Sequence, residues 1–191
     1  MPYFTAVLTA EDDRWSAVDV DLTPGPPEEV GDLLRNAVED EAEVLAVLER
    51  EDEWFAVLRA DREGEVRVFV SDAIAATGSR YADLFAELPP PEGARRTAAA
   101  GTATGDAAAD PDAGDDVSDT DTGARAADDA EETPAAVVAA DLWAGDADLL
   151  ADLGVSAEDL VRIAGEAGDP AVATTEIAEH LGAGDVLESL R

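Results

Sequence analysis

The middle of the chain constrains its fold more than any other stretch, because it holds almost no side chains from which a core could be built. Residues 92–135 contain no aromatic residue, and Val117 is their only large aliphatic residue. They carry 12 acidic and 3 basic side chains, for a net charge of −9. Such a stretch buries too little apolar surface to offset the loss of chain entropy. We therefore predict a disordered acidic linker over residues 92–135, between an ordered domain at 1–91 and a second one at 136–191.

The chain as a whole is strongly acidic. Its 191 residues include 46 Asp and Glu against 12 basic residues, all of them Arg, for a formal net charge of −34. Binding to nucleic acids and to anionic lipids is carried by Lys and Arg that neutralise phosphate. The charge therefore argues against direct binding to nucleic acid or to a membrane, and it leaves a basic protein surface open as a partner. A GC-rich genome or adaptation to high salt accounts equally well for part of the acidity.

Nothing in the sequence indicates export or membrane insertion. Residues 1–8 carry no basic side chain, and acidic residues follow at Glu11, Asp12 and Asp13, which is unlike a signal peptide. No apolar run approaches the roughly 20 residues that a membrane helix needs. The absence of Cys excludes disulfides, thiolate nucleophiles and Cys-ligated metals. We expect a soluble cytoplasmic protein.

Residues 1–91 hold most of the aromatic residues and begin with a hairpin pattern. Two β-rich runs, at 3–9 and 14–20, are joined by a short polar turn. Apolar residues then recur at helical spacing over 30–38, after a Pro-Pro start signal.

Three further strands and a second helix complete this segment, with the strands expected at 44–48, 53–60 and 65–71 and the helix at 81–88. The short turns between the strands require antiparallel pairing. The order is therefore ββαβββα, and the fold class is α+β, with the antiparallel sheet covered by helices on one face. Because Trp54 and Phe55 are adjacent on a predicted strand, they point to opposite faces of the sheet. We expect both to be core residues, unless one of them is exposed.

Residues 136–191 predict a small helical unit. Ser156 and Asp159 have the spacing of a capping box, which starts a helix that ends near Gly168. A further short helix is expected over 175–181, and a last turn capped by Asp185 follows it. The unit has few apolar anchors, so it is marginal by itself.

The residues offer no catalytic, cofactor-binding or metal-binding motif. The single His180 lies four residues after Glu176, and this pair supplies at most two ligands, so a surface or capping role is favoured. An EF-hand loop that begins at Asp119 would place Ala124 and Ala130 where Gly and Glu are required. No Gly-rich phosphate loop and no Gly-x-Ser-x-Gly elbow is present. We therefore predict no catalytic residue, no metal site and no cofactor.

Five blocks of sequence resemble a known family. Together they resemble the actinobacterial family of tRNA adenosine deaminase-associated proteins, and the blocks are Tyr3–Leu8, Asp52–Val57, Val66–Ala73, Gly145–Gly154 and Ile177–Gly182. The sequence departs from the family in its long acidic linker and in the Ala-rich last helices. The resemblance implies tRNA adenosine deaminase as a partner and implies no activity of the chain itself.

The chain is not itself a zinc deaminase of the kind that edits tRNA. Such enzymes need a His-x-Glu and a Pro-Cys-x-x-Cys to hold the metal and move protons, whereas His180 is followed by Leu181-Gly182 and no Cys is present. Our first hypothesis is therefore a non-enzymatic accessory protein that binds the deaminase. The alternatives are an enzyme that uses carboxylates such as Asp12, Asp13 or Asp72, and an acidic soluble protein without a dedicated partner.

Overall fold

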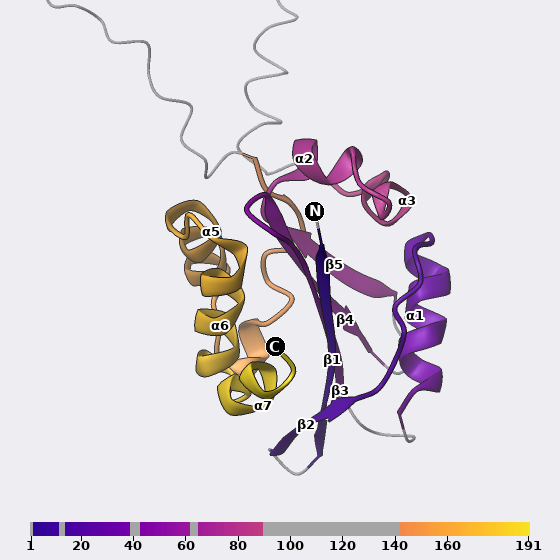
Figure 1. Cartoon of the computed structure of the whole chain (residues 1–191), viewed down its shortest axis with the longest axis vertical. Helices are drawn as coiled ribbons and strands as arrows, with labels where there is room; N and C mark the ends of the chain where they lie inside the picture. Colours follow the sequence, from indigo (N-terminus) through magenta and orange to yellow (C-terminus); the bar gives the residue numbers. More distant parts are fainter. Residues whose placement is uncertain (1, 12–13, 39–42, 62–64, 90–141) are drawn as a thin grey trace, which may run out of the picture.

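The computed structural model describes residues 2–11, 14–38, 43–61, 65–89 and 142–191. Within these ranges a six-stranded antiparallel sheet has the order β2-β1-β3-β4-β5-β6. Figure 1 shows the sheet between α1 on one side and α5, α6 and α7 on the other. The strands are β1 (Tyr3–Glu11), β2 (Arg14–Val18), β3 (Glu43–Arg50), β4 (Trp54–Ala60), β5 (Val66–Val70) and β6 (Ala144–Gly145). The helices are α1 (Pro27–Asn36), α2 (Ala73–Thr77), α3 (Ala82–Phe85), α5 (Ala157–Glu166), α6 (Pro170–His180) and α7 (Gly184–Ser189), with a 3-10 turn, η2, at Ala151–Leu153.

The α+β class is confirmed, and the first segment has the order ββαβββαα, with two short helices, α2 and α3, where one helix was expected. β1 and β2 form the expected hairpin, in which Glu11 pairs with Arg14, and β3 to β5 form the expected meander. α1 begins with Pro27 at its first position, where the missing N–H of proline leaves no hydrogen bond unmade. The second helical pattern is shorter than expected, because α3 covers only Ala82–Phe85.

One face of the sheet packs against helices that follow its strands closely in sequence. Trp54 is fully buried on this face and its ring meets that of Phe85 edge-on at 5.2 Å between centroids. Val30 and Leu34 bring α1 into the same core. The Tyr81 hydroxyl donates to the carbonyl of Leu22 at 3.0 Å, which satisfies a polar group inside this core.

The other face packs against residues 142–191. Phe55 and Phe69 point to this side and share a core with Leu149, Leu160 and Ile163. The opposite orientations of Trp54 and Phe55 are thus confirmed, and each is covered by helices. Ser156 caps α5 as expected, because its Oγ accepts from the backbone N–H of Asp159 at 3.2 Å.

The helices of the first segment cover one face of the sheet, as expected, and residues 142–191 cover the other face, which the sequence analysis did not predict. The packing of both faces is clearest at β4, in which all seven residues are buried. A strand without an exposed position has both faces packed. β6 was not expected either, because two residues carry no alternation. It relies on Gly145, whose φ is +99° and where a Cβ would lie 2.0 Å from the carbonyl oxygen of Val68.

The domain boundaries predicted at residues 91 and 136 lie outside the described residues, as does the predicted linker. The division of the chain into domains therefore stays a prediction. The described parts of the two segments share one core, and the backbone N–H of Gly145 donates to the carbonyl of Pro89 at 3.0 Å. Two helix starts differ from expectation. α6 begins at Pro170 with Asp169 as its cap. α7 has Ala183 at its N-cap position, without a side-chain hydrogen bond, and Asp185 lies in its first turn.

Candidate functional site

Charged side chains of the strands meet residues 142–191 at several points, of which two form the candidate sites. We name these the Arg59 cluster and the Glu49 pocket. The Arg59 cluster comprises Arg59, Glu43, Asp61, Asp152 and the carbonyl of Leu149. The Glu49 pocket is a surface cavity of about 280 Å³, and it is lined by Pro2, Tyr3, Phe4, Glu49, Glu51, Asp52, Asp169, Pro170 and Ala171.

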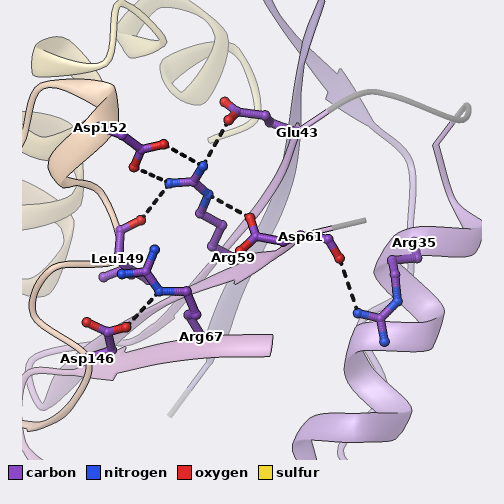
Figure 2. A network of polar contacts seen from close by, with 8 residues as sticks. All are labelled: Arg35, Glu43, Arg59, Asp61, Arg67, Asp146, Leu149 and Asp152. Atoms are coloured by element: carbon purple, nitrogen blue, oxygen red, sulfur yellow. Dashed lines mark hydrogen bonds and ion pairs between the residues drawn. The ribbon is translucent and has the colours of Figure 1, made fainter. Parts of the chain in front are cut away.

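The guanidinium of Arg59 is the centre of the first cluster (Figure 2). Its side chain is 7% exposed. It donates two hydrogen bonds to the Asp152 carboxylate, at 2.5 and 2.7 Å, and a third to the Leu149 carbonyl at 2.9 Å. Nη2 also binds Glu43 at 2.9 Å, and Nε lies 3.1 Å from Asp61 as an ion pair. These contacts join β4 to the turn before α5.

The same arrangement continues on the neighbouring strand. Nε of Arg67 on β5 donates to Asp146 at 2.7 Å, beside the Arg59 cluster (Figure 2). The hydrogen bond from Arg67 lowers the pKa of Asp146, and the hydrogen bonds from Arg59 lower that of Asp152, in each case against a smaller effect of burial. The hydrogen bonds with Asp152 in turn raise the pKa of Arg59. These ion pairs connect Asp146 and Asp152 to β5 and β4.

Glu49 is the buried carboxylate of the second site. It lies at the end of β3 and is 5% exposed. The Thr174 hydroxyl on α6 donates to its Oε1, and Nη2 of Arg191 donates to the same oxygen at 2.5 Å. Burial raises the pKa of Glu49, and the hydrogen bond from Thr174 and the charge of Arg191 lower it to a smaller extent.

Arg191 completes this arrangement. Its Nη2 also donates to Thr174 Oγ1 at 2.9 Å and to the Ala171 carbonyl at 3.2 Å. Its guanidinium carbon lies 5.0 Å from the centroid of the Phe4 ring, which is a cation–π contact. Glu49 therefore binds Thr174 on α6 and Arg191, and Arg191 in turn lies over Phe4 on β1.

A second, smaller cavity lies on the other side of the β3–β4 turn. Its volume is about 210 Å³, and it shares Asp52 and Pro170 with the Glu49 pocket. Asp52 has a φ of +58°, a left-handed conformation that Asp tolerates better than most residues. This end of the molecule therefore carries two cavities that both have acidic residues in their walls.

Of the candidate residues that the structure describes, Asp72 lines the second cavity with Asp52, Glu53 and Glu166, whereas His180 lines neither cavity. Asp72 accepts from the backbone N–H of Ala75 at 2.9 Å and so caps α2. His180 is exposed, and its Nδ1 lies 2.7 Å from the carbonyl oxygen of Glu176. Asp12, Asp13 and the calcium-loop candidate that begins at Asp119 lie outside the described residues. In the described part of the chain, no group of three or more His, Asp and Glu could hold a metal ion.

Sequence reasoning missed Glu49 and Arg59. Both interrupt apolar strands: Glu49 follows the run 44–48, and Arg59 stands near the end of β4. A charged residue in a strand that is buried on both faces needs a partner, and this signal was present. The partners Asp152, Thr174 and Arg191 were beyond reach, because they lie 93 to 142 residues further along the chain.

The described residues thus define an α+β protein with two small acidic cavities and with internal ion pairs that join distant segments. A family model described as Rv3753c-like tRNA adenosine deaminase-associated protein matches residues 3–114, and the chain belongs to this family. The match runs from β1 through α3 and ends before β6. No curated protein and no solved structure matches the chain.

The family description sets the chain apart from the deaminase itself, because it describes an associated protein. Among the described helices, none is long and apolar enough to cross a membrane.

Proposed function

We propose that the chain is a non-enzymatic accessory protein that binds tRNA adenosine deaminase and modulates it through its acidic surface. One observation carries the proposal. Of the eight arginines in the described part of the chain, six are engaged in ion pairs with the chain's own carboxylates; these are Arg35, Arg50, Arg59, Arg67, Arg162 and Arg191. Positive charge that is already paired is poorly placed to neutralise phosphate. This supports a protein partner over direct contact with RNA.

The uncompensated charge of the chain supports a basic partner. The described residues include 27 acidic side chains against those eight arginines. An enzyme that modifies tRNA must present a basic surface to the phosphates of its substrate. Complementary charge speeds association and favours the correct partner. The acidic chain would then dock at or beside the tRNA surface of the deaminase and act as a partial mimic of nucleic acid.

The carboxylates that stand closest to an enzymatic arrangement are already committed to other contacts. Asp72 caps a helix, and Glu49 is bound by Thr174 and Arg191. A catalytic acid or base must instead reach the substrate. This supports a binding role for the chain over catalysis by carboxylates.

Binding between the two purified proteins tests the proposal. The chain and the deaminase of the same organism are titrated by calorimetry at about 0.1 M and about 1 M salt, where the Debye length falls from about 10 Å to about 3 Å. We expect binding at low salt and a steep loss at high salt. The absence of binding at low salt would favour an acidic protein without a dedicated partner.

A variant that lacks residues 92–135 separates long-range charge from docked contacts. The residues on either side of 90–141 are hydrogen-bonded to each other, since Gly145 binds Pro89. Replacing 92–135 by a short Gly-Ser linker therefore removes a charge of −9 without separating the described parts. Association should slow, while the dissociation rate should stay the same, because charge far from the contact acts mainly on encounter. An unchanged association rate would show that the charge of residues 92–135 does not contribute to binding.

A further inference from the structure

We propose that the Glu49 pocket is a binding site for an arginine side chain of a partner protein, and that Arg191 occupies its carboxylate in cis until that arginine replaces it. The identity of the partner rests on the proposed function. The arginine-binding chemistry rests on the residues of the pocket alone.

A seated guanidinium already shows what the site accepts. Arg191 is held by a buried carboxylate, a hydroxyl and a backbone carbonyl, which come from Glu49, Thr174 and Ala171. Its guanidinium carbon lies over the ring of Phe4. All three acceptors are met by one nitrogen, Nη2, so the contact with the Phe4 ring is what favours a planar guanidinium over the compact ammonium of lysine.

The pocket is continuous with this seat. Phe4, Glu49 and Ala171 line the cavity and also contact Arg191. Three further carboxylates, from Glu51, Asp52 and Asp169, stand on the walls of the same cavity. Its volume of about 280 Å³ lies just below the usual range for small-ligand sites, so it suits the end of one side chain better than a folded element. A second guanidinium therefore has room and attracting charge beside Glu49.

The difference in burial between the partners favours exchange over simple release. The Glu49 side chain is 6% exposed, whereas that of Arg191 is 27% exposed. Leaving a buried carboxylate without a cation is costly. Arg191 is therefore expected to leave when another cation takes its place. An arginine from a basic partner would release Arg191 and couple binding to a change at the end of α7.

Peptide binding to the full-length chain tests this inference without the deaminase, so its failure leaves the proposed function untouched. The probes are a capped Gly-Arg-Gly peptide and its Gly-Lys-Gly counterpart, and binding to wild type and to Arg191→Ala is followed by NMR titration. We expect Arg191→Ala to bind the arginine peptide about tenfold more tightly than wild type. The lysine peptide should gain less.

Two further variants and a spectroscopic control keep the test decisive. Glu49→Gln in the Arg191→Ala background should abolish the gain, and Arg162→Ala, which removes an exposed arginine on α5, should leave the affinity of wild type unchanged. Should a variant unfold by circular dichroism, a shift of the Arg191 side-chain resonance on adding peptide to wild type decides instead. Equal affinities of wild type and Arg191→Ala, equal binding of the two peptides, or an unmoved Arg191 resonance would overturn the inference.

Discussion

The two faces of the sheet are covered in different ways. On the Trp54 face, α1, α2 and α3 come from the same stretch of chain as the strands and pack through apolar side chains. On the Phe55 face, residues 142–191 return from beyond a separation of 52 residues and are joined to the strands by charged side chains as well as by a core. The family match includes α1, α2 and α3 and ends before residues 142–191.

The comparison teaches what a distant segment needs in order to find its place. A helix adjacent in sequence is positioned by a short connection. Residues 142–191 have no such constraint, and an apolar core alone fixes register weakly. The Arg59 cluster and the Glu49 contacts each require specific partners, so they define where the segment sits. We therefore assign the role of positioning residues 142–191 to the Arg59 cluster and to the contacts of Glu49, and buried polar groups are known to have such a role in other proteins.

Truncating the adjacent aromatic residues is expected to have the largest effect. Trp54 and Phe55 are neighbours on β4, and both are almost fully buried on opposite faces. Trp54→Ala and Phe55→Ala should each lower the free energy of unfolding by about 3–5 kcal/mol, because each leaves a cavity in a packed core. Urea denaturation with a common slope measures both. A much smaller loss for Phe55→Ala would show that the second cover is loosely packed.

Removing the centre of the Arg59 cluster is expected to have an intermediate effect. Arg59→Ala should lower the free energy of unfolding by about 2 kcal/mol, because several charge-assisted hydrogen bonds are lost while the remaining carboxylates stay in contact with water. Arg162→Ala is the matched control. Its ion pairs with Glu166 and Glu176 are exposed, so little change is expected. Equal effects of the two substitutions would mean that the cluster has no structural role.

The smallest effect is expected from the charge of Glu49, and it is visible in the pH dependence. Because burial raises the pKa of Glu49 above 4.5, the native state binds this proton more tightly than the unfolded chain, and stability falls as the pH rises through the interval above 4.5. Glu49→Gln should therefore gain stability relative to wild type as the pH rises above 4.5, as measured by urea midpoints.

Asp152→Asn supplies the opposite case. Arg59 holds the pKa of Asp152 below 3.8, so the stability from this carboxylate is fully present above 3.8 and is lost as the pH falls below it. The difference between Asp152→Asn and wild type should stay constant over the range in which Glu49→Gln changes. A flat profile for Glu49→Gln would contradict the raised pKa of Glu49.

Local pattern was enough to predict the first half of the fold. Alternating and continuous apolar runs gave β1 to β5, and the spacing of residues 30–38 gave α1. These elements are contiguous in sequence, so short turns alone dictate how they pair. The cover of the second face was not predicted, because the pattern within 136–191 gives helices without saying where they dock.

The polar sites show the same limit. The strand positions of Glu49 and Arg59 carried a signal, missed in the sequence analysis, that each needs a partner, but any of the many carboxylates in the chain could have paired with Arg59. The choice of Asp152 depends on the tertiary position of η2. Arg191 gave no local signal, because a single arginine after a helix is typical of a solvated chain.

Competition with tRNA is the most direct test of the proposed function. The chain is bound to the deaminase at low salt, and tRNA is titrated into the complex while the bound fraction is measured. If the acidic surface occupies the tRNA surface of the deaminase, saturating tRNA displaces the chain, and the affinity falls as salt increases. If saturating tRNA displaces none of the chain and the affinity is indifferent to salt, the account is contradicted, and docking occurs through an apolar surface instead.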